Sequence, residues 1–142
     1  MKLHIITVGQ PKLDYARKGW EEYWKRLGHY HQLRVTHIAD KNNDAEHILA
    51  AAENSYKVGL VIEGKQFNSR GLAEFLEKRA LDGREVSFII GGPDGLPPAV
   101  QAGLDFSWSF GALTLPHDLA MVVLLETLYR ASTINAGQPY HR

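Results

Sequence analysis

The last three residues of this chain, Tyr140, His141 and Arg142, place three chemically useful side chains in a row. An aromatic face can stack on a nucleobase, an imidazole can take up a proton near neutral pH, and a guanidinium can meet a phosphate. The order predicts a catalytic tail that handles an extruded or single-stranded base. A chain end is also commonly flexible and without a role, and this alternative stays open.

A second stretch predicts a ligand site. Residues 87–95 read Ser-Phe-Ile-Ile-Gly-Gly-Pro-Asp-Gly, so an apolar strand runs directly into Gly91 and Gly92. A ligand can approach the backbone there because no side chain stands in the way, although a tight turn into a helix would explain the pair equally well. Neither a dinucleotide fingerprint nor a phosphate-binding loop occurs. Such nearly uncharged loops favour a cofactor whose adenine and sugar are held by backbone groups and shape.

The elements that must position these residues follow from the pattern of apolar side chains. Strands are predicted at 3–8, 33–37, 58–62, 86–90 and 106–110, and helices begin near Asp14, the 40–44 turn, Ser69, Pro97 and Pro116. Asp14 and Ser69 are the expected N-caps, and the second helix is expected to reach Tyr56. Strands separated by helices predict an α/β fold, a mainly parallel sheet with helices on both faces.

Ligands bind beyond the carboxyl ends of the strands in such a sheet. That edge consists here of segments 62–64, 91–95 and 111–116. The helix that begins at Pro116 carries a nearly continuous apolar surface, more than the face of one domain usually needs. His117 in its first turn could touch a ligand or only solvate the helix start, and the structural role is favoured. Glu126 and Arg130 are spaced to pair with each other.

The amino-acid composition limits the number of domains and the classes of binding partner that the chain can have. The 142 residues, 44% of them hydrophobic, predict one domain spanning 1–142. Sixteen Lys and Arg balance sixteen Asp and Glu, so the chain lacks the net positive charge that a general nucleic-acid-binding protein carries. A local basic patch around the first helix could still meet RNA, or be a solvated face: Lys12, Arg17, Lys18, Lys25 and Arg26.

The chain contains no cysteine, so disulfides and thiolate metal sites are excluded, and His29 and His31 lack a carboxylate partner that would suggest a metal ion. No metal is expected. The sequence predicts neither a signal peptide nor a membrane span, and a cytoplasmic location is the default.

Five motifs together resemble one family over the whole length of the chain. They are Phe88-Ile-Ile-Gly-Gly-Pro-Asp-Gly95, Ser107-Trp-Ser109, Leu113-Thr-Leu-Pro-His117, Glu126-Thr-Leu-Tyr-Arg130 and Pro139-Tyr-His-Arg142. The chain resembles the ribosomal RNA large subunit methyltransferase H family, the smallest members of the SPOUT superfamily.

The resemblance implies a C-terminal trefoil knot, a homodimer, and transfer of a methyl group from S-adenosylmethionine to N3 of a pseudouridine in 23S rRNA on the assembled ribosome. Cofactor contacts carried over from the family fall on Leu60, Gly91, Phe110, Gly111, Ala112, Leu113, Thr114 and Leu115. The tail residues Tyr140, His141 and Arg142 are the expected catalytic group. Two alternatives remain: a related methyltransferase acting on another RNA such as tRNA, or a non-catalytic module that associates with the ribosome.

Overall fold

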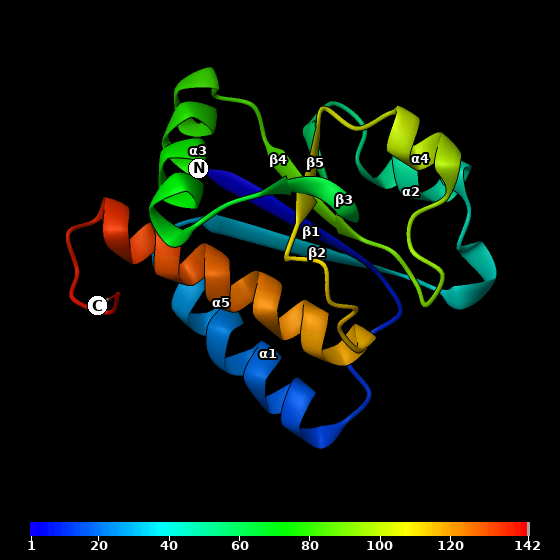
Figure 1. Ribbon diagram of the computed structural model, residues 1–142, viewed down its shortest axis with the longest axis horizontal. Coiled ribbons are helices and arrows are strands. Elements are labelled where there is room, and N and C mark those ends of the chain that lie inside the picture. The colour runs from blue at the N-terminus through cyan, green and yellow to red at the C-terminus, as the bar shows by residue number, and fades with distance from the viewer. Residues whose placement is uncertain (142) are drawn as a thin grey trace.

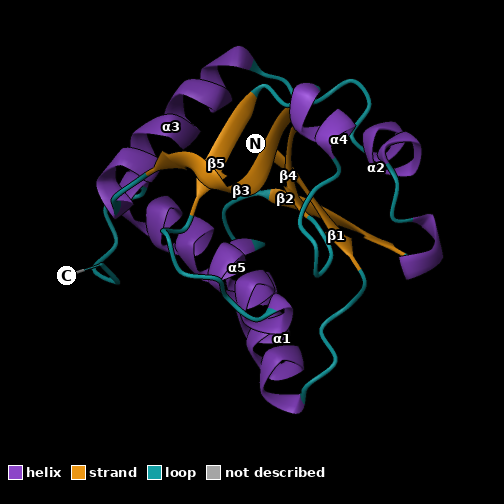
Figure 2. Ribbon diagram, turned by 45° about the vertical axis from the view of Figure 1, so that its right-hand side comes forward, coloured by secondary structure: helices purple, strands orange, loops and turns teal. Residues whose placement is uncertain are grey.

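The computed structural model describes residues 1–141 and contains one parallel sheet between two layers of helices (Figures 1 and 2). The elements are β1 (Lys2–Val8), α1 (Asp14–Leu27), β2 (Gln32–Ile38), the 3₁₀ helix η1 (Asp40–Asn42), α2 (Ala45–Ala51), β3 (Tyr56–Gln66), α3 (Ser69–Asp82), β4 (Val86–Ile90), α4 (Pro98–Ala102), β5 (Phe106–Ser109) and α5 (His117–Asn135). The strand order is β2-β1-β4-β3-β5, and all neighbours are parallel. The predicted α/β fold is confirmed.

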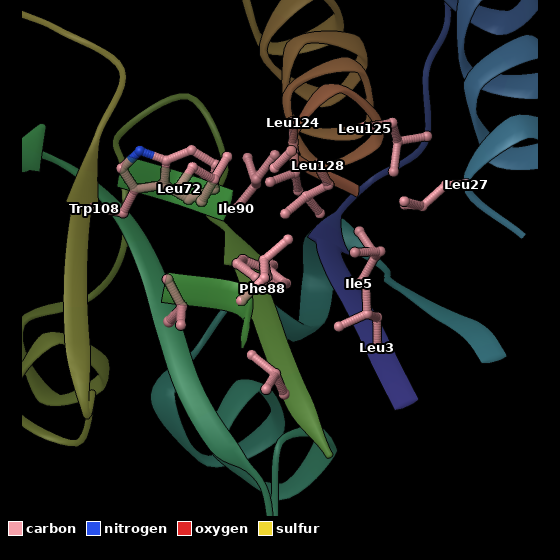
Figure 3. Packing of buried hydrophobic residues seen from close by; sticks show 14 of the residues in the cluster. Leu3, Ile5, Leu27, Leu72, Phe88, Ile90, Trp108, Leu124, Leu125 and Leu128 are labelled. Carbon is pink, nitrogen blue, oxygen red and sulfur yellow. The ribbon is translucent and has the colours of Figure 1, made fainter. Parts of the chain in front are cut away.

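Two apolar clusters hold the layers together. On one face of the sheet, α1, α3 and α5 pack on alternate residues of β1 and β4, and Figure 3 shows Leu124 and Leu128 of α5 above Phe88. On the opposite face, α2 and α4 cover a smaller cluster that includes Ile6 and Ile89. Period-two alternation in the strands therefore supplies both faces, as a doubly covered parallel sheet requires.

The central strand β4 is buried along its full length. It lies between β1 and β3, which pair with it from either side. Because all strands run the same way, the carboxyl end of β4 opens onto Gly91 between the ends of its two neighbours. The apolar strand and the glycine pair thus place a backbone turn at the middle of one sheet edge.

Three local predictions are wrong. The second helix does not reach Tyr56: α2 ends at Ala51, and the chain turns through Asn54, whose φ of 62° breaks the helix, so that Tyr56 begins β3. Asn68, rather than Ser69, caps α3, because its side chain accepts a hydrogen bond from the Gly71 amide at 2.7 Å.

Asp14 is likewise the first residue of α1 and not its cap; the capping position belongs to Leu13, which has no side chain able to cap. The acceptor in this region is distant in sequence. The Asp118 carboxylate in the first turn of α5 accepts hydrogen bonds from the amides of Lys12 at 2.8 Å and Leu13 at 2.6 Å. A side chain 105 residues away therefore supplies what local sequence does not.

None of the helices within residues 1–141 is long and apolar enough to cross a membrane.

Candidate functional site

A cavity of about 580 Å³ opens at the carboxyl edge of the sheet. The segments that follow β3, β4 and β5 form its walls, and the first turn of α5 closes one side. Seven of the eight residues carried over from the family resemblance line it: Leu60, Gly91, Phe110, Gly111, Leu113, Thr114 and Leu115. Ala112 does not; it is exposed between its lining neighbours.

The wall after β4 is a tight turn that only glycine allows. A Cβ at Gly91 would lie 2.6 Å from the backbone C and O atoms of Gly95. The Gly95 amide donates to the Gly92 carbonyl at 2.9 Å, and Gly95 adopts a φ of 79°. Glycine is therefore required at position 91 by the close backbone approach and favoured at position 95 by its positive φ, and the bare backbone of both residues forms part of the cavity wall.

The wall after β3 comes from an irregularity in the sheet. Leu60 and Lys65 both pair with Trp108, so residues 61–64 loop out between them. Gly64 permits the return because a Cβ there would lie 2.7 Å from the Ser107 backbone. Val61 and Ile62 consequently line the cavity. Ile62 belongs to the segment 62–64 expected at this edge, whereas Val61 is expected only as part of the strand at 58–62.

The third wall follows β5. Phe110 packs edge-on against Trp108, with ring centroids 5.0 Å apart, and Gly111 then turns the chain with a φ of 132°. The Ser109 hydroxyl accepts a hydrogen bond from the Gly111 amide at 3.0 Å and fixes this corner. Leu113 is 81% exposed, so it presents a large apolar side chain at the cavity mouth.

The start of α5 connects the cavity to β1. The His117 ring donates from Nε2 to the Val8 carbonyl at 2.7 Å, and the same ring lines the cavity. The neighbouring Asp118 is only 8% exposed and holds the β1–α1 loop through the two amides described above. His117 is thus both structural and placed to touch a ligand.

The cavity carries little charge. Its walls are mostly apolar side chains and glycine backbone, and Asp94 and His117 are the only titratable residues in them. Residues 1–141 contain no cluster of His, Asp and Glu that could hold a metal ion. The cavity therefore suits an organic ligand with a large apolar surface and a positive charge near Asp94.

The tail lies folded against α1 and α5. The Tyr140 ring packs edge-on against Tyr129 at 4.7 Å between centroids, and its hydroxyl lies 3.3 Å from that of Tyr23. Burial and this hydrogen bond raise the pKa of Tyr140 to about 12. Arg130 lies over the same ring at 4.9 Å and forms the predicted pair with Glu126 at 2.7 Å.

His141 joins the cluster through its Nδ1 atom, 3.5 Å from a guanidinium nitrogen of Arg130. Arg142, the third predicted tail residue, lies outside the described residues. The tail is therefore an aromatic and basic cluster held by Tyr23, Tyr129 and Arg130.

The structure does not bring this tail to the cavity of its own chain. The cavity touches His117 and Ala120 at the start of α5, whereas the tail contacts Tyr129 and Arg130. A helix rises 1.5 Å per residue, so these contacts lie about 14–20 Å apart along its axis. In Figure 1 the C-terminal end of the chain lies near the last turn of α5, at the opposite end of that helix from its first turn.

Comparison with known proteins shows to which protein family this chain belongs. A family model described as "Predicted SPOUT methyltransferase" matches residues 1–141, and the chain belongs to this family. The methylase-family structure from Haemophilus influenzae has a TM-score of 0.63 at 12% identity, covering 99% of this chain and 70% of that one. The SpoU methyltransferase AviRb from Streptomyces viridochromogenes, solved with AdoMet, gives a TM-score of 0.52 at 16% identity over 98% of this chain and 59% of that one. At such identities these likenesses concern the fold.

Two relatives of much higher sequence identity carry a more specific name than the family model does. A protein of Deinococcus radiodurans is 54% identical over 100% of this chain and 99% of its own length. One of Deinococcus deserti is 52% identical over the full length of both. Each is named ribosomal RNA large subunit methyltransferase H, the family that the five sequence motifs resemble.

Proposed function

We propose that this chain transfers the methyl group of S-adenosylmethionine to N3 of a pseudouridine in 23S rRNA of the assembled ribosome. The observation that carries the proposal is the cavity at the carboxyl edge of the sheet, whose walls contain seven of the eight expected cofactor contacts. Membership of the SPOUT methyltransferase family and two full-length relatives named for the large-subunit RNA support it.

The residues present fit S-adenosylmethionine. A volume of about 580 Å³ lies within the range of small-molecule sites, and bare backbone at Gly91 and Gly95 lets adenine and ribose approach closely. When bound, the cofactor supplies an electrophilic methyl group on a positively charged sulfur. Asp94 would attract that charge, while Leu60, Leu113 and Leu115 would exclude water from it.

The acceptor base would be held by the tail. We infer that Tyr140 stacks on the base, His141 contacts it and Arg142 meets a phosphate. Because the tail of one chain lies about 14–20 Å from its own cavity along α5, the protein is proposed to act as a homodimer in which one chain's tail reaches the partner's cavity. The half-buried side chains of Leu119 and Val123 on α5 suit such an interface.

Further features belong to the same proposal. The chain would act as a single domain, residues 1–142, with its C-terminal part threaded as the family's trefoil knot. The basic residues around α1 would face RNA, and the ribosomal substrate places the reaction in the cytoplasm.

Incubation with radiolabelled S-adenosylmethionine tests the proposal. The acceptors are ribosomes from a strain lacking the modification, free 23S rRNA, and tRNA. Label on intact ribosomes, mapped to N3 of a pseudouridine by mass spectrometry, is the expected result. Label on tRNA alone would favour a related methyltransferase, and cofactor binding without transfer to any acceptor would favour a non-catalytic module. Sedimentation equilibrium measures whether the chain is a dimer.

A further inference from the structure

His117 is the only histidine in the cavity wall. All seven histidines of the chain fall within residues 1–141, and the other six do not line the cavity. His4, His31 and His37 bond to hydroxyl groups of Thr36, Ser132 and Thr7. On the described chain, His117 is therefore the imidazole base placed next to a bound methyl donor, beside the carboxylate of Asp94.

A backbone carbonyl fixes the tautomer of His117. Nε2 lies 2.7 Å from the carbonyl oxygen of Val8. That oxygen can only accept, so Nε2 carries the hydrogen, and the neutral ring leaves its lone pair on Nδ1. Within residues 1–141, Nδ1 has no hydrogen-bond partner and does not belong to the buried side-chain atoms that lack one. The ring thus presents an accessible, unprotonated nitrogen.

A further contact keeps the start of α5 in place. The Asp118 carboxylate ties the first turn of α5 to the β1–α1 loop through the Lys12 and Leu13 amides. Gly9 lies close to the ring, since a Cβ added there would be 3.9 Å from Nε2. A base whose other ring nitrogen is held by a third group is the arrangement that proton-transfer sites use.

We propose that His117 accepts the N3 proton of the target base during methyl transfer. This rests on the function proposed above. The N3–H bond breaks as its proton passes to Nδ1, the N3–CH3 bond forms, and the S–CH3 bond breaks with its electron pair returning to sulfur. The products are a methylated base, a neutral thioether and an imidazolium, which then loses its proton to water. The tail keeps the task of holding the base.

Three acidic residues lie around His117. Asp118 follows it on α5, and Asp94 lines the same cavity from the β4–α4 loop. Asp40 of η1 lies near the same point of Gly9 as the ring, since a Cβ added there would be 3.5 Å from the Asp40 carboxylate and 3.9 Å from His117 Nε2.

Single-turnover methylation of ribosomes tests the assignment. His117→Gln retains an amide that can donate to the Val8 carbonyl but cannot accept the proton, so the rate should fall at least about 100-fold. The affinity for S-adenosylhomocysteine should stay within about threefold. The wild-type rate should rise with pH along an acidic limb, and this limb should vanish in the variant. His29→Gln, an exposed histidine away from the cavity, should change neither.

The His141→Gln variant distinguishes the role of His141 in the tail from that of His117 in the cavity. It should weaken ribosome binding and keep the acidic limb of the rate profile. A His117→Gln enzyme with an unchanged profile, or a His141→Gln enzyme that loses the limb, would overturn the proposal.

Nitrogen-15 NMR of the imidazole rings tests His117 even if the variant folds poorly. In the free wild-type protein, Nδ1 of His117 should show the shift of an unprotonated nitrogen, and a protonated Nδ1 in the neutral ring overturns the assignment. Addition of S-adenosylhomocysteine should move this resonance. Failure of the wild type to label any RNA would instead refute the proposed function, so the two failures are distinguishable.

Discussion

Replacing Gly91 by alanine tests the proposed cofactor site most directly, because the clash it creates is with backbone. The new Cβ would lie 2.6 Å from the C and O atoms of Gly95 and 2.8 Å from the Leu96 amide nitrogen, where ordinary contact begins at 3.4 Å. The turn must therefore retreat by about 0.8 Å, and no side-chain rotation can absorb this. Overpacking of this kind costs about 1–3 kcal/mol.

The same movement displaces one wall of the cavity. We expect the dissociation constant for S-adenosylmethionine to rise at least about tenfold, which corresponds to about 1.4 kcal/mol of lost binding free energy. Isothermal titration calorimetry measures the affinity, and urea unfolding monitored by tryptophan fluorescence measures the stability.

Two other glycines show how much backbone strain alone costs, and only one of them lies in the cavity wall. Gly83 and Gly95 have φ values of 80° and 79°, and a Cβ at either meets nothing within 4 Å. Alanine should cost each about 1 kcal/mol of stability through backbone strain alone. Gly83 caps α3, away from the cavity, so its variant should bind the cofactor normally, whereas Gly95→Ala places a methyl group in a lining turn and should bind less well. A folded Gly91→Ala protein with wild-type affinity would refute the site.

Four other changes have defined outcomes. Asp94→Asn should weaken binding of S-adenosylmethionine about threefold and leave binding of S-adenosylhomocysteine, whose sulfur is neutral, unchanged in calorimetry, because an exposed carboxylate attracts the sulfonium charge only modestly. Asp118→Ala should cost about 3 kcal/mol in urea unfolding, since two amides lose their acceptor. Deletion of residues 140–142 should abolish methyl transfer with cofactor affinity within about twofold, and normal turnover would contradict the role of the tail. Burial lowers the pKa of His31 from 6.5 to about 4, so as the pH falls this histidine takes up a proton in the unfolded chain before it does so in the folded protein. The free energy of unfolding should therefore decrease between pH 6.5 and pH 4. His31→Gln should reduce this decrease by about 2 kcal/mol, after allowance for the partial exposure of the ring.

The sheet could be predicted because its signal is local. β4 reads as an uninterrupted apolar strand and is buried along its length, and Gly83 ends α3 with the left-handed conformation that glycine permits. Strand–helix alternation then fixes which edge holds the loops, and five specific motifs add the family. Both routes lead to the same cavity.

The parts that sequence could not predict depend on contacts between distant segments. Residues 61–64 loop out because Leu60 and Lys65 both pair with Trp108 of β5. The sequence around Leu60 contains no signal that predicts this pairing. The true acceptor at the start of α1 is Asp118, which approaches only after α5 packs beside that helix. The role of His117 in the cavity likewise depends on the position of Val8, 109 residues earlier.

The length of α5 decides how the site must be assembled. The helix places the cavity at its first turn and the tail near its last, because Tyr140 packs on Tyr129 and Arg130. A tail that stayed in this position could not reach a base at its own cavity, about 14–20 Å away along the helix axis. If the tail is needed for transfer, activity must depend on a second chain. Mixing a cavity-defective Gly91→Ala chain with a tail-deleted chain should therefore restore methylation, since one mixed site combines an intact cavity with an intact tail; if neither mixing nor refolding the chains together restores activity, the shared site is wrong.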